Sequence, residues 1–163
     1  MPFVILMTHG ETNSTAEGLT VAGLLTTMRK ANAVLACLPE GQRVPRPQIF
    51  CGSDSDCLQT ADIFAAQYVS GFSIKPALRD GPEECELMAL AREMAASPEN
   101  IAVISHAKTV SRLVEQLAAV RGEAMASRLP ELTMDEVLAV ELNGKPIAET
   151  LRVSKAPKFD IRI

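Results

Sequence analysis

The chain has 163 residues and a net charge of −4 at pH 7, and 47% of its residues are apolar. This length suits one domain, since two cores would have about 80 residues each, and the apolar content excludes a disordered chain. The excess of acidic side chains argues against binding to nucleic acid or to an anionic membrane. Because His9 and His106 are the only histidines, any chemistry that needs imidazole must use one or both of them.

Short apolar runs alternate with longer segments of helical periodicity. Strands are predicted at 3–7, 48–51, 72–74 and 101–104, and helices at 19–38, 55–69, 82–96 and 110–120. The segments 134–142 and 147–153 flank Asn143-Gly144, a pair that favours a two-residue hairpin because both residues tolerate positive φ. This order predicts one α/β domain over residues 1–163. Its three layers would hold a mostly parallel sheet between helices, with an antiparallel C-terminal hairpin.

The compartment is predicted from two features. The apolar run at 3–7 is too short for a signal sequence or a membrane span, and no later apolar stretch reaches about 18 residues. The four cysteines form no C-x-x-C pair and lie in apolar segments, which favours reduced thiols in the cytoplasm. A Cys51–Cys57 disulfide is the alternative. We therefore expect a cytoplasmic protein with neither a membrane nor a nucleic acid as partner.

Both histidines directly follow a predicted strand. His9 comes after the run at 3–7, and His106 comes after the run at 101–104. Loops at the carboxyl ends of parallel strands line the ligand crevice of such sheets, so the two imidazoles converge if their strands are neighbours. The alternative is that each histidine is a hydrogen-bonded polar residue at a strand end. The matched placement of the pair favours a shared site.

Four motifs, in order along nearly the whole chain, resemble the histidine phosphatase superfamily, which has the phosphoglycerate mutase-like fold. LMTHGET at 6–12 resembles the R-H-G-E-T signature, and LTVAG at 19–23 resembles the L-T-x-x-G helix start. QTA at 59–61 matches the end of S-x-L-x-R-A-x-Q-T-A, and VISH at 103–106 matches V-x-S-H. The small size and the hairpin ending are most similar to the short bacterial phosphohistidine phosphatases.

The resemblance implies roles for particular residues. His9 would be the nucleophile that becomes phosphorylated, because a neutral imidazole can attack phosphorus, and His106 would be its catalytic partner. Glu83 lies near the position where longer members carry a general acid, although a solvated first helical turn explains it equally well. The substrate would be a small phosphorylated molecule or a phosphohistidine protein, with no metal ion and no cofactor. The residues at or beside the substrate would be Thr8, Gly10, Asp56, Ala107 and Lys108.

The two arginines that hold the phosphoryl group in the family are replaced. The first falls on Thr8, and the alignment at 59–61 places the second on Asp56. Two unit charges about 6 Å apart interact by roughly 3 kcal/mol at an effective dielectric near 20. Exchanging Arg for Asp would then weaken the binding of a monoanion by about 5 kcal/mol, or roughly four decades in affinity. A carboxylate also favours protonated imidazole, which cannot attack, so we expect weak or absent phosphomonoester turnover.

Two other cations are candidates to replace the arginines. Lys108 follows His106 by two residues, and Arg79 lies at a predicted strand end. Neither reproduces two converging guanidinium groups, and each is also explained as a solvated surface cation.

Three functions remain open at this point. The first is a phosphatase with an altered substrate or with residual activity through His9. The second is a non-catalytic relative that keeps the fold and a pocket for binding or regulation. In the third, His9, His106 and Asp56 converge as ligands of a divalent metal ion, with Glu83 as a further ligand.

Overall fold

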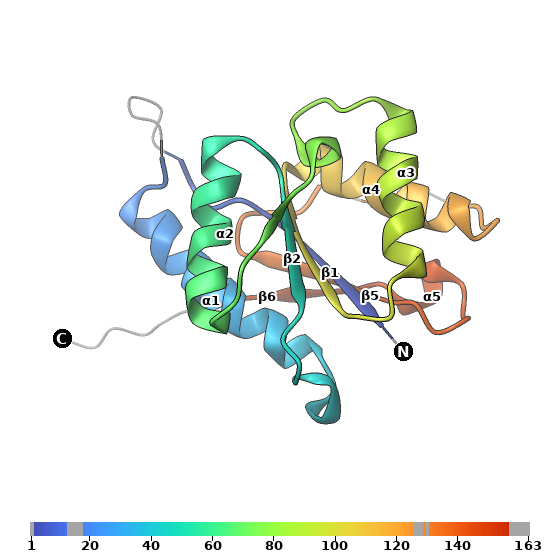
Figure 1. The fold of residues 1–163 in the computed structure, drawn as a ribbon, viewed down its shortest axis with the longest axis horizontal. Coiled ribbons are helices and arrows are strands. Elements are labelled where there is room, and N and C mark those ends of the chain that lie inside the picture. The colour runs from blue at the N-terminus through green and yellow to red at the C-terminus, as the bar shows by residue number, and fades with distance from the viewer. Residues whose placement is uncertain (1, 13–17, 126–128, 130, 157–163) are drawn as a thin grey trace.

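The structure is a computed structural model that describes residues 2–12, 18–125, 129 and 131–156. Six strands of the described chain form one mixed sheet in the order β3-β2-β4-β1-β5-β6 (Figure 1). β1 and β4, β2 and β4, and β2 and β3 are parallel pairs, whereas β5 is antiparallel to both β1 and β6. The strands are β1 (Phe3–Thr8), β2 (Gln48–Cys51), β3 (Ser73–Ile74), β4 (Ile101–Ser105), β5 (Glu136–Glu141) and β6 (Arg152–Lys155).

Helices cover both faces of the sheet, with α1 and α2 on one side and α3 and α4 on the other (Figure 1). β1 and β4 are buried along their whole length, as parallel strands between two helical layers must be. Val4 and Leu6 of β1 pack into the core with α3 and α4, and Ile5 and Met7 pack into the core with α1 and α2. The predicted three-layer α/β architecture is confirmed. The four long helices are α1 (Val21–Cys37), α2 (Ser55–Tyr68), α3 (Glu84–Ala96) and α4 (Ala107–Val120).

The helix starts are set by local capping. Thr20 caps α1, because its hydroxyl accepts a hydrogen bond from the Gly23 amide at 2.9 Å. α3 begins at Glu84, and Glu83 forms a capping box with Glu86 ahead of it. α4 begins directly after β4, at residue 107, three residues earlier than the apolar periodicity predicted. This early start makes His106 the N-cap residue of α4.

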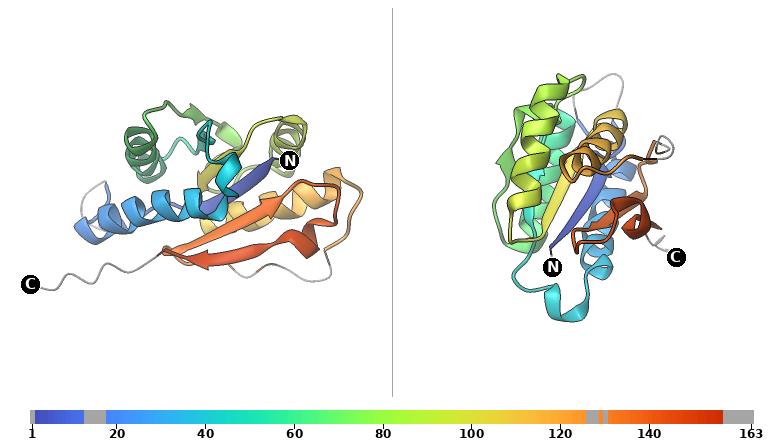
Figure 2. Two further views of the ribbon diagram at one scale, coloured as in Figure 1. Left: turned by 90° about the horizontal axis from the view of Figure 1, so that it is seen from below. Right: turned by 90° about the vertical axis from the view of Figure 1, so that its right-hand side faces the viewer.

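The C-terminal strands pair as predicted, but their connection is different. β5 and β6 are antiparallel, yet Asn143-Gly144 is not a two-residue turn between them. The helix α5 (Ile147–Thr150) occupies half of the strand predicted at 147–153 (Figure 2). Pro146 has no N–H for a strand ladder and directly precedes α5. Ile147 is completely buried in the core beside α4, and we attribute the short helix to this burial.

The thiols and the helix lengths bear on the predicted compartment. All four cysteines are free, so the alternative of a Cys51–Cys57 disulfide is wrong. Both of these thiols are buried. In the described part of the chain, the helices are too short or too polar to cross a bilayer.

Candidate functional site

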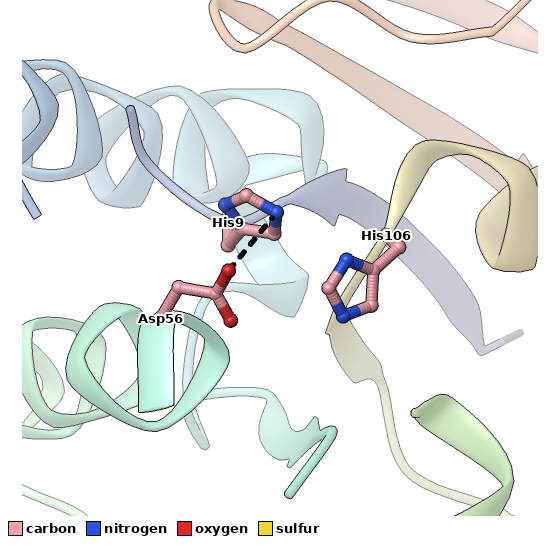
Figure 3. A group of neighbouring side chains, drawn as sticks. All are labelled: His9, Asp56 and His106. Carbon is pink, nitrogen blue, oxygen red and sulfur yellow. Dashed lines mark ion pairs between the residues drawn. The ribbon is translucent and has the colours of Figure 1, made fainter. Parts of the chain in front are cut away.

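The sheet brings the two histidines together at the carboxyl ends of β1 and β4. These strands are neighbours, with Thr8 in register with Ser105, and the His9 amide donates to the Ser105 carbonyl at 3.2 Å. His106 follows directly at the start of α4. The centroids of the two rings lie 5.0 Å apart, with the ring planes inclined by 72°. Figure 3 shows both rings beside the Asp56 carboxylate, which comes from α2.

Close backbone packing fixes the position of His9. A Cβ atom on Gly10 would lie 2.7 Å from the Thr27 hydroxyl and 2.9 Å from the Gly23 carbonyl oxygen, so only glycine fits between β1 and α1. The Gly10 amide donates to the Thr60 hydroxyl at 3.1 Å. The His9 Nδ1 donates to the Gly10 carbonyl at 2.8 Å. Because a carbonyl can only accept, Nδ1 carries the proton and Nε2 is directed into the site.

Asp56 is held against His9 from the first turn of α2. The Thr60 hydroxyl donates to the Asp56 carbonyl at 2.8 Å, so one threonine links the His9 loop to this helix. Asp56 Oδ2 lies 3.4 Å from His9 Nε2, and their side chains are only 20% and 15% exposed. Both atoms carry lone pairs, so the space between them favours a cation over an anion.

Asp54 is a site residue that the sequence analysis did not single out. Its Oδ2 accepts a hydrogen bond from His106 Nε2 at 2.7 Å, and this bond holds the pKa of the Asp54 carboxyl below its usual value. Asp54 is the N-cap residue of α2, but its side chain makes no capping hydrogen bond. An N-cap aspartate usually accepts from its own helix, so its sequence position alone gave no signal of a role at His106.

Lys30 is a second unexpected residue beneath the site. Its side chain is completely buried in α1, and Nζ donates to the Thr8 carbonyl at 2.6 Å. Burial lowers the pKa of Lys30 to about 8, against the opposing charge of Asp135. The Thr8 hydroxyl is buried and has no hydrogen-bond partner within the part of the chain that the structure describes. Lys30 therefore fixes the backbone just before His9, whereas the Thr8 side chain adds no polar contact there.

The remaining predicted residues lie around this centre with different surroundings. Glu83 caps α3 and is exposed, and it is not among the grouped ligand atoms of His9, Asp56 and His106. Ala107 is the first residue of α4, and Lys108 is exposed beside it. The Arg79 guanidinium is bound by the Glu86 carboxylate through two hydrogen bonds, of 2.9 and 2.6 Å. These bonds hold Arg79 to α3.

Among the residues that the structure describes, the charged groups that contact the two imidazoles are the carboxylates of Asp56 and Asp54. His9, Asp56 and His106 each present one ligating atom, and these atoms all lie within 4.8 Å of one another. The N-termini of α2 and α4 also point here and favour anions by about 0.3–1 kcal/mol each. This contribution is small beside two carboxylates, so the arrangement suits a proton or a cation better than an anion.

Comparison with known proteins identifies the fold. The sequence matches no protein-family profile and no curated protein. The protein histidine phosphatase SixA, solved with tungstate, is 20% identical over 93% of this chain and 94% of that chain, with a TM-score of 0.62. YhfR of Bacillus stearothermophilus is 16% identical over 95% of this chain and 96% of that chain, with a TM-score of 0.62. A mycobacterial glucosyl-3-phosphoglycerate phosphatase, solved with VO3, is 13% identical over 95% of this chain and 98% of that chain, with a TM-score of 0.65.

These similarities span almost the full length of each protein. The chain therefore has the fold of the histidine phosphatase superfamily, and the resemblance stated from the motifs at 6–12, 59–61 and 103–106 is confirmed at the level of the fold. The structure also explains one of these motifs physically. In the segment at 59–61, Thr60 joins Gly10 to the Asp56 backbone, and the Gln59 side chain accepts from the Leu19 amide at 2.7 Å.

Proposed function

We propose that this chain is a histidine phosphatase-like protein in which phosphoryl transfer through His9 is weak or absent. The observation that carries the proposal is the Asp56 carboxylate, 3.4 Å from His9 Nε2. It occupies the space beside the nitrogen that would have to attack phosphorus. The phosphatase activities named for the structures with this fold support the reaction class, and the carboxylate supports its loss.

The reaction makes two demands on His9 that this geometry opposes. Nε2 must offer its lone pair to phosphorus while the ester P–O bond breaks and the leaving oxygen takes a proton, and water must then hydrolyse phospho-His9 to release phosphate. The Asp56 carboxylate lies 3.4 Å from Nε2, beside the lone pair that would have to reach phosphorus. The same carboxylate repels the phosphoryl oxygens, whose developing charge an active site must stabilise.

The proposed role is therefore binding or regulation at the carboxyl ends of β1 and β4, where His9 and His106 lie. A phosphorylated ligand, whether a small molecule or a phosphohistidine protein, would bind only weakly there, because the carboxylates of Asp54 and Asp56 repel it, and it would not be turned over efficiently. We also propose a cytoplasmic location, because four free thiols suit a reducing compartment.

Hydrolysis of a generic aryl phosphate tests the proposal. Wild-type protein and His9→Ala are purified by the same route and assayed with a chelator present, so that contaminants and metal ions contribute equally. We expect the two rates to lie within about threefold of each other, since His9 should contribute little to catalysis. A threefold difference corresponds to less than about 1 kcal/mol in the activation free energy. A wild-type rate that exceeds that of His9→Ala by orders of magnitude overturns the proposal. Circular dichroism confirms that both proteins are folded.

A further inference from the structure

We propose that His9, Asp56 and His106 form a binding site for a divalent transition-metal ion, for which zinc has the best-suited chemistry. This site goes beyond the proposed function, because weak phosphoryl transfer does not require a metal ion. His9 directly follows β1, Asp56 lies in the first turn of α2 and His106 is the N-cap residue of α4, so the fold itself brings them together (Figure 3).

The spacing of the ligand atoms fits a tetrahedral ion. Ligand atoms about 2.0–2.1 Å from zinc are separated by about 3.3–3.4 Å at the tetrahedral angle. His9 Nε2 and Asp56 Oδ2 already have this separation, at 3.4 Å. The ligating atom of His106 lies within 4.8 Å of the other two. A rotation of one side chain would bring it to the same spacing, so that the three residues would occupy three corners of the tetrahedron. The fourth corner would hold water, as in sites with three protein ligands.

Both histidines are oriented as metal ligands usually are. In metal sites, the ring nitrogen that does not bind the ion donates to a carbonyl or a carboxylate, which fixes the tautomer. His9 Nδ1 donates to the Gly10 carbonyl at 2.8 Å, which leaves Nε2 for an ion. His106 Nε2 donates to Asp54 at 2.7 Å, which leaves Nδ1. Each ring thus has one nitrogen occupied and one available.

The charge balance of the site also favours a cation. Asp56 and Asp54 contact the two imidazoles, and Asp54 makes its contact without capping α2, which would otherwise stabilise the helix by about 1 kcal/mol. Two imidazoles and one carboxylate suit zinc better than magnesium or calcium, which prefer oxygen ligands. The two rings are only 15% and 20% exposed, so an ion would be partly shielded from solvent yet reachable.

Metal titration of the chelator-treated full chain tests this site. We expect one equivalent of Zn²⁺ to bind, measured by calorimetry and by elemental analysis after desalting. Co²⁺ should give the visible absorption of a tetrahedral site without a thiolate charge-transfer band. The exposed thiol of Cys85 is the competing zinc ligand, and Cys85→Ser should leave the affinity unchanged.

Variants separate the direct ligands from the positioning residue. Asp56→Asn or His9→Gln should weaken Zn²⁺ binding by about 100-fold or more, because each removes one of three protein ligands. Asp54→Asn, which acts through His106, should weaken it by about 10- to 100-fold and should also alter the Co²⁺ spectrum. Asp62→Asn is the matched control, since Asp62 is an exposed residue of the same helix. It should bind like wild type.

Three results would overturn the metal site: no stoichiometric binding, equal affinity in Asp56→Asn and Asp62→Asn, or loss of binding in Cys85→Ser. Absence of binding would show that the His9 imidazole and the Asp56 carboxylate contact each other without holding an ion. The aryl phosphate assay contains a chelator, so its outcome is independent of this one. Failure of the metal site therefore leaves the proposed loss of phosphoryl transfer standing, and the reverse also holds.

Discussion

Replacing Asp56 by asparagine should strengthen phosphate binding beside His9. Asp56 Oδ2 lies 3.4 Å from His9 Nε2, and a phosphorus atom poised for attack would lie about 3–3.5 Å from the same nitrogen. A phosphate oxygen would then be about 4 Å from the carboxylate, where two unit charges repel by about 4 kcal/mol at an effective dielectric of 20. The Asp56 side chain is 20% exposed, so solvent screening reduces this to about 2–3 kcal/mol. The dissociation constant should fall by about 30- to 150-fold.

Asparagine suits this test because it keeps the shape of the side chain. Its amide oxygen can still accept from the Cys57 amide, as Asp56 Oδ1 does at 2.8 Å. Phosphate affinity is measured by calorimetry at pH 7 and low ionic strength with a chelator present, because salt weakens the contribution of charge. Asp62→Asn, an exposed change on the same helix, corrects for the altered net charge. A change in affinity below about threefold, or an equal change in Asp62→Asn, would refute the electrostatic reasoning.

Two further predictions concern the support beneath His9. Lys30 has a folded pKa near 8, against 10.5 for an ordinary lysine. The unfolding free energy of wild type relative to Lys30→Met should therefore rise by up to about 3 kcal/mol between pH 8 and 10.5, because only the unfolded chain still binds that proton. Urea unfolding of both proteins across this pH range measures the difference in their unfolding free energies. A difference that does not change with pH would contradict the lowered pKa of Lys30. Gly23→Ala should destabilise the fold by about 1–3 kcal/mol, because its Cβ would lie 2.3 Å from the Glu11 carbonyl oxygen. Gly41→Ala has open space around it and should be close to neutral in thermal unfolding.

The parts of the fold that the sequence predicted are those with strong periodicity. The runs at 3–7 and 101–104 are apolar because both faces of β1 and β4 are buried, whereas the adjacency of the two strands was left open by the sequence and is given by the sheet order. The convergence of His9 and His106 follows from that adjacency. The start of the strand predicted at 147–153 was wrong, since residues 147–150 are helical and β6 begins at Arg152. The turn signal at Asn143-Gly144 outweighed Pro146 in the prediction, and the burial of Ile147 depends on the assembled core.

The residues that sequence analysis missed share one property: their roles depend on contacts across the fold. Asp54 has the sequence context of an ordinary helix cap, and only the fold shows its contact with His106, which is 52 residues away. Lys30 lies in a helical segment where a charged residue is expected to be exposed, yet it reaches the Thr8 carbonyl. Neither contact leaves a local pattern. Asp56 was found because the resemblance assigns its position, and the structure adds its distance to His9.

The central proposal is that the carboxylates of Asp54 and Asp56 make the site at His9 and His106 prefer a cation to phosphate. The two imidazoles report on this preference directly. Nitrogen-15 spectra of the wild-type imidazoles are recorded first with millimolar phosphate and then, after its removal, with one equivalent of Zn²⁺. Because His9 and His106 are the only histidines, the signals are assigned with one His9→Gln variant. We predict that phosphate leaves both rings unchanged and that Zn²⁺ shifts Nε2 of His9 and Nδ1 of His106 toward values for metal-bound nitrogen. Shifts of both rings with phosphate, together with no response to Zn²⁺, would contradict the account.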